Sequence, residues 1–139
     1  QVIIAGKTYM EILDKKGKLL AKFIRHKKHS VDKNFFTENK EELQVASFNL
    51  KKDETIIRHY HPKQDRVIKT TSEVIIIKTG VLQIDIYDDS HEFIDNFILE
   101  DGDIAILISG GHGLKVINDC EFIEVKQGPY NESTDKIRF

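Results

Sequence analysis

The chain has 139 residues, of which 40% are hydrophobic and 32% are charged, a composition typical of one soluble globular domain rather than a disordered tail. No apolar run approaches the roughly 20 residues of a membrane-spanning helix, and 21 Lys and Arg against 23 Asp and Glu give a formal charge of −2. Neither a membrane nor nucleic acid is therefore an expected partner.

Side chains that favour β-strands dominate the composition: Ile, Val and Thr number 20, 8 and 7, whereas Ala and Leu number 4 and 9. A helical turn is expected only at residues 37–42, with Thr37 as its N-cap. Chains of many short strands remove their edges by closing or stacking, which predicts an all-β antiparallel barrel or sandwich. Apolar or alternating runs between turn signals predict about ten strands, at residues 8–13, 18–25, 43–50, 55–60, 73–78, 81–87, 93–99, 104–108, 114–117 and 122–126.

Residues 73–87 predict a β-hairpin, because two β-rich runs flank Thr79 and Gly80, where glycine supplies the positive φ of a tight turn. Alternation then places the carboxylate of Glu73 on one face with five aliphatic side chains. A lone carboxylate on such a face is costly to bury unless a cation or a strong donor meets it, so we expect a partner for Glu73. The five aliphatic residues are Ile75, Ile77, Leu82, Ile84 and Ile86.

Two histidines lie at the end of the predicted strand 55–60. Strand side chains alternate, so His59 and His61 project to the same face, about 6 to 7 Å apart along the backbone, and can converge on one ion. His112 is a third candidate, because the glycines around it let the backbone bend closely round a centre. Together with Glu73, these imidazoles form a donor set suited to a divalent transition metal.

The same residues resemble the two motifs of the cupin superfamily, the small jelly-roll barrels. The first motif is a His-x-His segment that runs on to a Glu and a Gly, and the second is a Gly-Asp segment that runs on to a His. Six residues separate the Glu and the Gly of the first motif, as the family pattern asks. The matches are His59, His61, Glu73 and Gly80 for the first motif and Gly102, Asp103, Gly110, His112 and Asn118 for the second.

This resemblance spans residues 55–126, about half of the chain, and implies one cupin-type jelly-roll β-barrel over residues 1–139. The barrel is an antiparallel double-stranded β-helix, with extra N-terminal strands in residues 1–50 and a C-terminal segment at 127–139. The implied metal ligands are His59, His61, Glu73 and His112, for Fe, Mn, Ni, Zn or Co, which these ligand types do not separate. Eleven residues lie between His61 and Glu73, so residues 62–71 are expected to form an inserted excursion near the mouth of the barrel.

Each candidate ligand also has a plainer interpretation. Glu73 can form a salt bridge with Arg58 or Lys69, and His112 can be a loop histidine whose neighbouring glycines only make a turn. His59 and His61 can be a pair of exposed or hydrogen-bonded histidines. These alternatives need no metal.

Groups near this centre suit an anionic ligand. Arg66 and Lys69 lie in the excursion, and Lys126 and Tyr130 lie at the end of the last strand and beyond it. Arginine holds a carboxylate or a phosphate in bidentate fashion, so these four residues are the predicted substrate-binding groups. The alternative is that the cations belong to an ordinary charged surface.

Three functions are compatible with the sequence. The first is a metal-binding cupin that binds or acts on a small polar or anionic metabolite; as an enzyme it would perform metal-assisted isomerisation, dioxygenation or hydrolysis. The second is a metal-free sugar-nucleotide epimerase or isomerase, with His61 or His112 as the base and Tyr60 or Tyr130 as the acid. The third is a non-catalytic module that binds or senses a small ligand.

Location and assembly are predicted from short segments. Residues 1–6 are too short an apolar stretch for a secretory signal, and Cys120 is the only cysteine, so the cytoplasm is the expected location. Asp119 and Glu121 flank Cys120 and are expected to raise the pKa of its thiol. The apolar residues 2–5 would form an exposed sheet edge, which predicts a homodimer.

Overall fold

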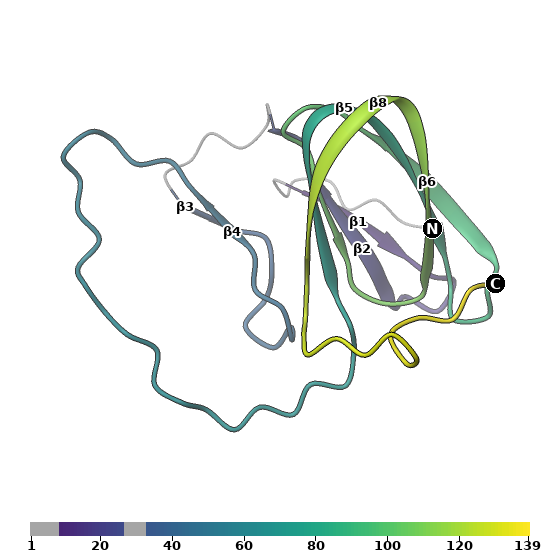
Figure 1. Cartoon of the computed structure of the whole chain (residues 1–139), viewed down its shortest axis with the longest axis horizontal. Helices are drawn as coiled ribbons and strands as arrows, with labels where there is room; N and C mark the ends of the chain where they lie inside the picture. The colour runs from purple at the N-terminus through teal and green to yellow at the C-terminus, as the bar shows by residue number, and fades with distance from the viewer. Residues whose placement is uncertain (1–8, 27–32) are drawn as a thin grey trace.

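The computed structural model describes residues 9–26 and 33–139 and shows an all-β chain whose main antiparallel sheet curls into a half-barrel (Figure 1). β3 and β4 form a separate two-stranded sheet beside it. Within the described residues the strands are β1 (Met10–Leu13), β2 (Leu19–Ile24), β3 (Lys33–Phe35), β4 (Ala46–Phe48), β5 (Glu73–Tyr87), β6 (Phe93–Leu99), β7 (Ile104–Leu107) and β8 (Gly111–Lys126).

The long strand β5 organises the main sheet, whose strand order is β1-β2-β7-β5-β6. On one side, the first part of β5 pairs with β7 over Glu73 to Ile76, and its second part pairs with β6 over Leu82 to Tyr87. On its other side, β8 accompanies β5 along its whole length. Because β5 changes neighbours halfway, the sheet bends there and the two halves face each other.

The predicted hairpin at Thr79 and Gly80 is wrong, because residues 73–87 form one continuous strand. Gly80 does have the expected positive φ, of 99°, but it lies among register shifts between β5 and β8 and bends the strand without reversing it. The Gly80 amide donates to the carboxylate of Asp101 at 2.8 Å. By the same pairing, the predicted strands 114–117 and 122–126 are two parts of β8.

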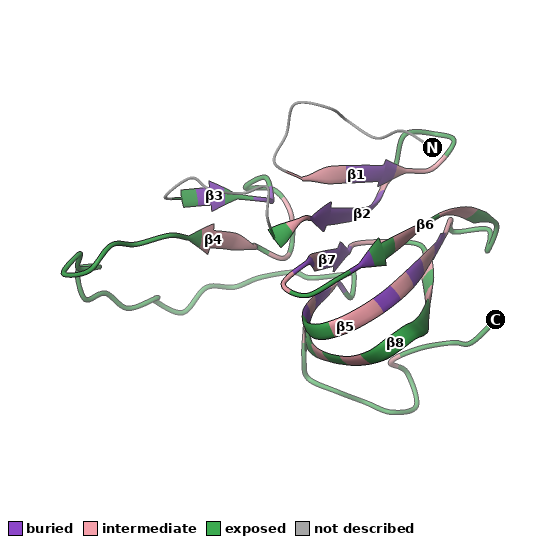
Figure 2. Ribbon diagram, turned by 90° about the horizontal axis from the view of Figure 1, so that it is seen from above, coloured by how far each residue is buried: buried purple, intermediate pink, exposed green. Residues whose placement is uncertain are grey.

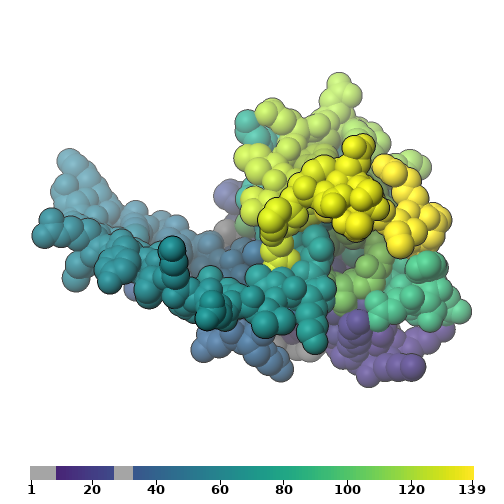
Figure 3. Space-filling view, turned by 60° about the horizontal axis from the view of Figure 1, so that its bottom comes forward, coloured from purple at the N-terminus to yellow at the C-terminus, as the bar shows by residue number. Residues whose placement is uncertain are grey.

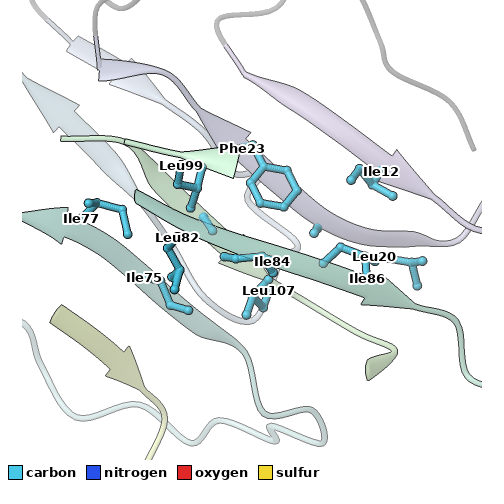
Figure 4. Packing of buried hydrophobic residues seen from close by; sticks show 12 residues of the cluster. Ile12, Leu20, Phe23, Ile75, Ile77, Leu82, Ile84, Ile86, Leu99 and Leu107 are labelled. Carbon is cyan, nitrogen blue, oxygen red and sulfur yellow. The ribbon is translucent and has the colours of Figure 1, made fainter. Parts of the chain in front are cut away.

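The predicted inner face of β5 is nevertheless confirmed, because the register shifts around Gly80 move the inward positions from odd residues before the bend to even residues after it. All five aliphatic side chains predicted for that face are buried in the main core, which also takes in Leu20, Phe23 and Leu99 from neighbouring strands (Figure 4). On the opposite face of the sheet, a smaller cluster packs Ile24 and Ile106 against Phe36. Two apolar layers therefore hold the curved sheet in place.

A buried lysine ties the turn after β3 to the sheet. The ammonium group of Lys22 donates to the carbonyl of Phe36 at 2.8 Å and to Glu41 at 2.9 Å. The helical turn predicted at 37–42 does not form. The Thr37 hydroxyl instead accepts the amide of Val45, and the Gln44 side-chain amide donates to the carbonyls of Glu38 and Glu41. Side-chain bonds thus replace the helical ladder at this turn.

Residues 49–72, which we call the arm, differ most from the sequence-based expectation. The predicted strand 43–50 is confined to β4, and the predicted strand 55–60 is an exposed extended segment instead. The arm leaves β4, runs along a wide path away from the half-barrel and returns to β5 (Figures 1 and 2). Local composition favours a strand at 55–60, but a strand also needs a neighbour, and the described part of this chain supplies none there.

Two further expectations concern the ends and surroundings of the fold. The apolar run 2–5, from which an edge and a dimer were predicted, lies outside the described residues. Across residues 9–26 and 33–139, no helix has the length and apolar character required to cross a membrane.

Replacing Gly80 by alanine is expected to destabilise the protein by at least about 3 kcal/mol. A Cβ at Gly80 would lie 2.0 Å from the carbonyl oxygen of Asp119, which lies within β8. Gly17→Ala is the matched control: its φ is 84° and nothing lies within 4 Å of the added Cβ, so it should cost about 1 kcal/mol. Urea denaturation of both variants measures the difference, and equal losses would contradict a bend that depends on Gly80.

Candidate functional site

The centre of the candidate site is a contact between Glu73 and His112, whose Oε2 and Nε2 atoms lie 3.3 Å apart. Glu73 begins β5, whereas His112 lies near the start of β8 and pairs with Ile86 at the far end of β5. The arch of β5 and β8 brings these two ends back to the same opening (Figure 1). The Glu73 side chain is 15% exposed and that of His112 is 32% exposed, so the pair lies at the mouth of the half-barrel.

Glu73 has the partner that its apolar face required. The hydrogen bond from His112 is the largest effect that lowers the pKa of Glu73; burial opposes it, and the charge on His112, a hydrogen bond with Glu124 and the charge on Lys126 add to the lowering. The carboxylate therefore stays ionised at neutral pH although it is half-buried. A partly buried carboxylate held against an imidazole can orient that ring.

Lys126 lies beside this pair but is already engaged. It pairs with Glu73 across the two strands, and its ammonium group donates to Asp135 at 3.0 Å and lies 5.3 Å from the centre of the Tyr130 ring. The hydrogen bond to Asp135 raises the pKa of Lys126, against the effect of burial. Of the four predicted substrate-binding residues, Lys126 therefore adjoins the Glu73–His112 pair, and Tyr130 lies beside Lys126.

The C-terminal segment closes over the same opening. It runs from the Asp135–Lys126 ion pair to Phe139, whose ring meets that of Tyr87 at 5.3 Å (Figure 1). Phe139 also lies directly over Gly111, because a Cβ there would come within 2.6 Å of its ring. Residues 127–139 therefore connect the two ends of the arch next to His112.

Glu124 is a second residue that sequence reasoning missed. It contributes to the lowered pKa of Glu73 and is the cross-strand partner of Ile75 on the inner face. A signal was available, because Glu124 stands two positions before Lys126 in a strand and therefore shares its face. The inner face of β8 thus carries charged side chains at the mouth and apolar ones deeper in the arch.

His59 and His61 lie elsewhere, on the exposed arm, with their ring centres 5.3 Å apart and nearly perpendicular. Nδ1 of His59 is hydrogen-bonded to the carbonyl of Ile57 at 2.9 Å, which leaves Nε2 as its ligand atom. Nowhere in residues 9–26 and 33–139 do three His, Cys, Asp or Glu side chains come together as a metal-binding group. Within one chain, the structure therefore brings Glu73 to His112 but not to His59 or His61.

Arg66 and Lys69, the other two predicted substrate-binding residues, are also exposed on the arm. The end of the arm that precedes β5 is fixed, because the backbone amides of Lys69 and Thr70 donate to the Glu42 carboxylate. The Thr70 hydroxyl also donates to this group and is the largest cause of its lowered pKa. The base of the arm is thus anchored to the turn that precedes β4.

The Glu73 and His112 atoms that meet are spaced as two ligands of one metal ion would be. Two ligands held about 2.1 Å from one ion at octahedral to tetrahedral angles lie about 3.0 to 3.4 Å apart, a range that contains the 3.3 Å between Glu73 and His112. An ionised carboxylate with a neutral imidazole is the chemical pairing that Fe, Mn, Co, Ni and Zn accept. Two such donors need at least one further protein ligand for a stable site.

Cys120 is not part of this centre. The pKa of its thiol is raised, as predicted, but the larger cause is burial and the smaller one is the charge of Asp101. A thiol with a raised pKa is a poor nucleophile at neutral pH.

Comparison of the chain with models of protein families, with curated proteins and with solved structures found no match.

Removing His112 is expected to raise the pKa of Glu73. Because the folded-state pKa of Glu73 is lowered, its ionised form stabilises the fold above the unfolded-state pKa, and this contribution is lost as the pH falls through the folded-state pKa. In His112→Ala the main cause of the lowering is gone while burial remains. Carbon-13 NMR titration of the Glu73 carboxyl in chelator-treated buffer measures the change. Lys16→Ala, at the exposed β1–β2 turn, is the control, and an unshifted Glu73 in His112→Ala would contradict the pairing.

Proposed function

We propose that this chain is a cupin-type jelly-roll protein that binds a divalent transition metal through His59, His61, Glu73 and His112 and uses the site to bind or convert a small anionic metabolite. The observation that supports this most directly is the Glu73–His112 contact at the mouth of the half-barrel. Its two donors come from opposite ends of a bent strand pair, and their separation suits two ligands of one ion. Fe, Mn, Ni, Zn and Co remain equivalent candidates.

The proposed anionic ligand would be held by groups beside this pair. A bound metal would supply a Lewis acid for a substrate oxygen at this opening. Lys126 keeps its positive charge next to Glu73, and Tyr130 presents a phenol beside Lys126. Arg66 and Lys69 lie on the arm and would add positive charge when the arm is near the mouth. A carboxylate or phosphate on the metabolite is the chemical group that this set would hold.

A second candidate, metal-free proton transfer, is favoured by the same contact. Glu73 engages Nε2 of His112, which leaves Nδ1 available as a general base, while Tyr130 is an acid within the same region. Oriented His and Tyr groups of this kind would suit epimerisation or isomerisation of a sugar nucleotide. The two candidates differ in their need for a metal.

His59→Ala and His61→Ala are each expected to remove the metal while the fold survives, because both residues are exposed and neither belongs to the core. Elemental analysis after reconstitution measures bound metal, and circular dichroism checks the fold. Lys16→Ala, at the exposed β1–β2 turn, is the control and should bind as the wild type does. Stoichiometric metal in both variants, or none in the wild type, would refute the assignment.

Chelation separates the two candidates. For the metal site, EDTA should lower the melting temperature of the reconstituted protein, because an ion that binds only the folded chain stabilises it. For metal-free proton transfer, a deoxythymidine diphosphate sugar should raise the melting temperature and EDTA should have no effect. Differential scanning fluorimetry with each addition makes this comparison.

A further inference from the structure

The arm is an extended segment whose middle part carries large apolar side chains that the described part of the chain leaves exposed. Ile57 is 83% exposed, Tyr60 is 84% exposed, and Ile56, Val67 and Ile68 also face solvent. Figure 3 shows the arm projecting from the half-barrel as a separate ridge. Several large apolar side chains gathered on one projecting segment are typical of a surface that another molecule covers.

The half-barrel is open along β8. In the described part of the chain this strand pairs with β5 alone, so its other edge, sixteen residues long, has no strand beside it. Leu114 and Val116 face inward beside the fully buried Ile84 and Leu82, yet they are 43% and 57% exposed. An exposed apolar edge of this length is a template for another strand.

The arm has the sequence of such a strand at residues 55–61. Ile57, His59 and His61 alternate with Ile56, Arg58 and Tyr60, and proline is absent until Pro62. A strand added to the free edge of β8 would place one of these sets on the inner face, in line with His112, Leu114 and Val116. The set that carries both histidines also carries the most exposed isoleucine of the arm.

The arm does not reach the β8 edge of its own chain. The base of the arm is tied to Glu42, and next to it the amide of Ser72 donates to Gln127 at 2.8 Å, whereas residues 50–65 extend away from the half-barrel in both views (Figures 1 and 2). A second copy of this chain offers both matching surfaces. Its β8 edge can accept the arm of the first copy, and its arm can pair with the β8 edge of the first copy. Such a reciprocal contact closes on itself around a two-fold axis.

We propose that two copies exchange arms, so that residues 55–61 of each form a strand on the free edge of β8 in the other and complete its barrel. The inference rests on the proposed function in one respect: the exchanged strand would bring the partner's His59 and the partner's His61 to Glu73 and His112. Each metal site would then have two ligands from one chain and two from the other. The exchange accounts for the missing ligands, the open barrel and the exposed arm with a single contact.

Disulfide trapping tests the exchange without reference to a metal. In a Cys120→Ala background, Ile57→Cys is combined with Leu114→Cys or with Val116→Cys, and the oxidised proteins are run on a non-reducing gel. Arm exchange predicts a covalent dimer for at least one of the two cysteine pairs. It also predicts that light scattering finds the unmodified protein to be a dimer. Ile57→Cys with Lys16→Cys, at the exposed β1–β2 turn, is the control and should stay monomeric on the gel. An intrachain disulfide, the absence of any disulfide, or a monomer by light scattering overturns the exchange.

Subunit mixing tests the shared site. A chain with His59→Ala and His61→Ala is refolded together with a chain that has Glu73→Gln and His112→Ala. Neither variant binds metal alone, but each mixed dimer would contain one site built only from wild-type residues and should bind one ion. Covalent dimers without restored metal would leave the exchange standing and refute the metal site, whereas covalent dimers with restored metal support both.

Discussion

The bend of β5 is the constraint on which the rest of the structure depends. One strand pairs with β7 over its first part and with β6 over its second, and β8 follows it through the bend at Gly80. The bend requires a residue that tolerates a φ of 99° and that has no Cβ, because the carbonyl oxygen of Asp119 lies where a Cβ would be. It turns a flat sheet into an arch, buries the aliphatic face inside and brings Glu73 back to His112.

The Glu73–His112 pair joins stability to function. A carboxylate at the end of an apolar strand face needs a partner in order to fold, and His112 meets it at 3.3 Å. The same contact keeps the carboxylate ionised and holds an imidazole at the opening, which a metal centre or a proton-transfer site requires. Glu124, Lys126 and Asp135 extend this polar group outward, and the apolar core begins directly behind it.

The open edge of β8 and the exposed arm are complementary features of one chain. Leu114 and Val116 lack a covering neighbour on the inner face, and Ile57 and Tyr60 lack one on the arm. Arm exchange between two copies would cover Leu114, Val116 and Ile57 and supply imidazoles to a pair of donors that is too small to hold an ion firmly. A site made of residues from two chains would also make ligand binding depend on assembly.

The alternation of apolar residues was sufficient to predict the β-rich class, the extent of β6 and the inner face from Ile75 to Ile86, because strand periodicity is a local property. It was also sufficient to predict that Glu73 needs a partner. Whether Gly80 reverses or bends the chain, which group meets Glu73 and where the histidines of the arm lie were decided by tertiary structure. A positive φ suits a turn and a bulge equally, and strand pairing depends on neighbours far away in the sequence.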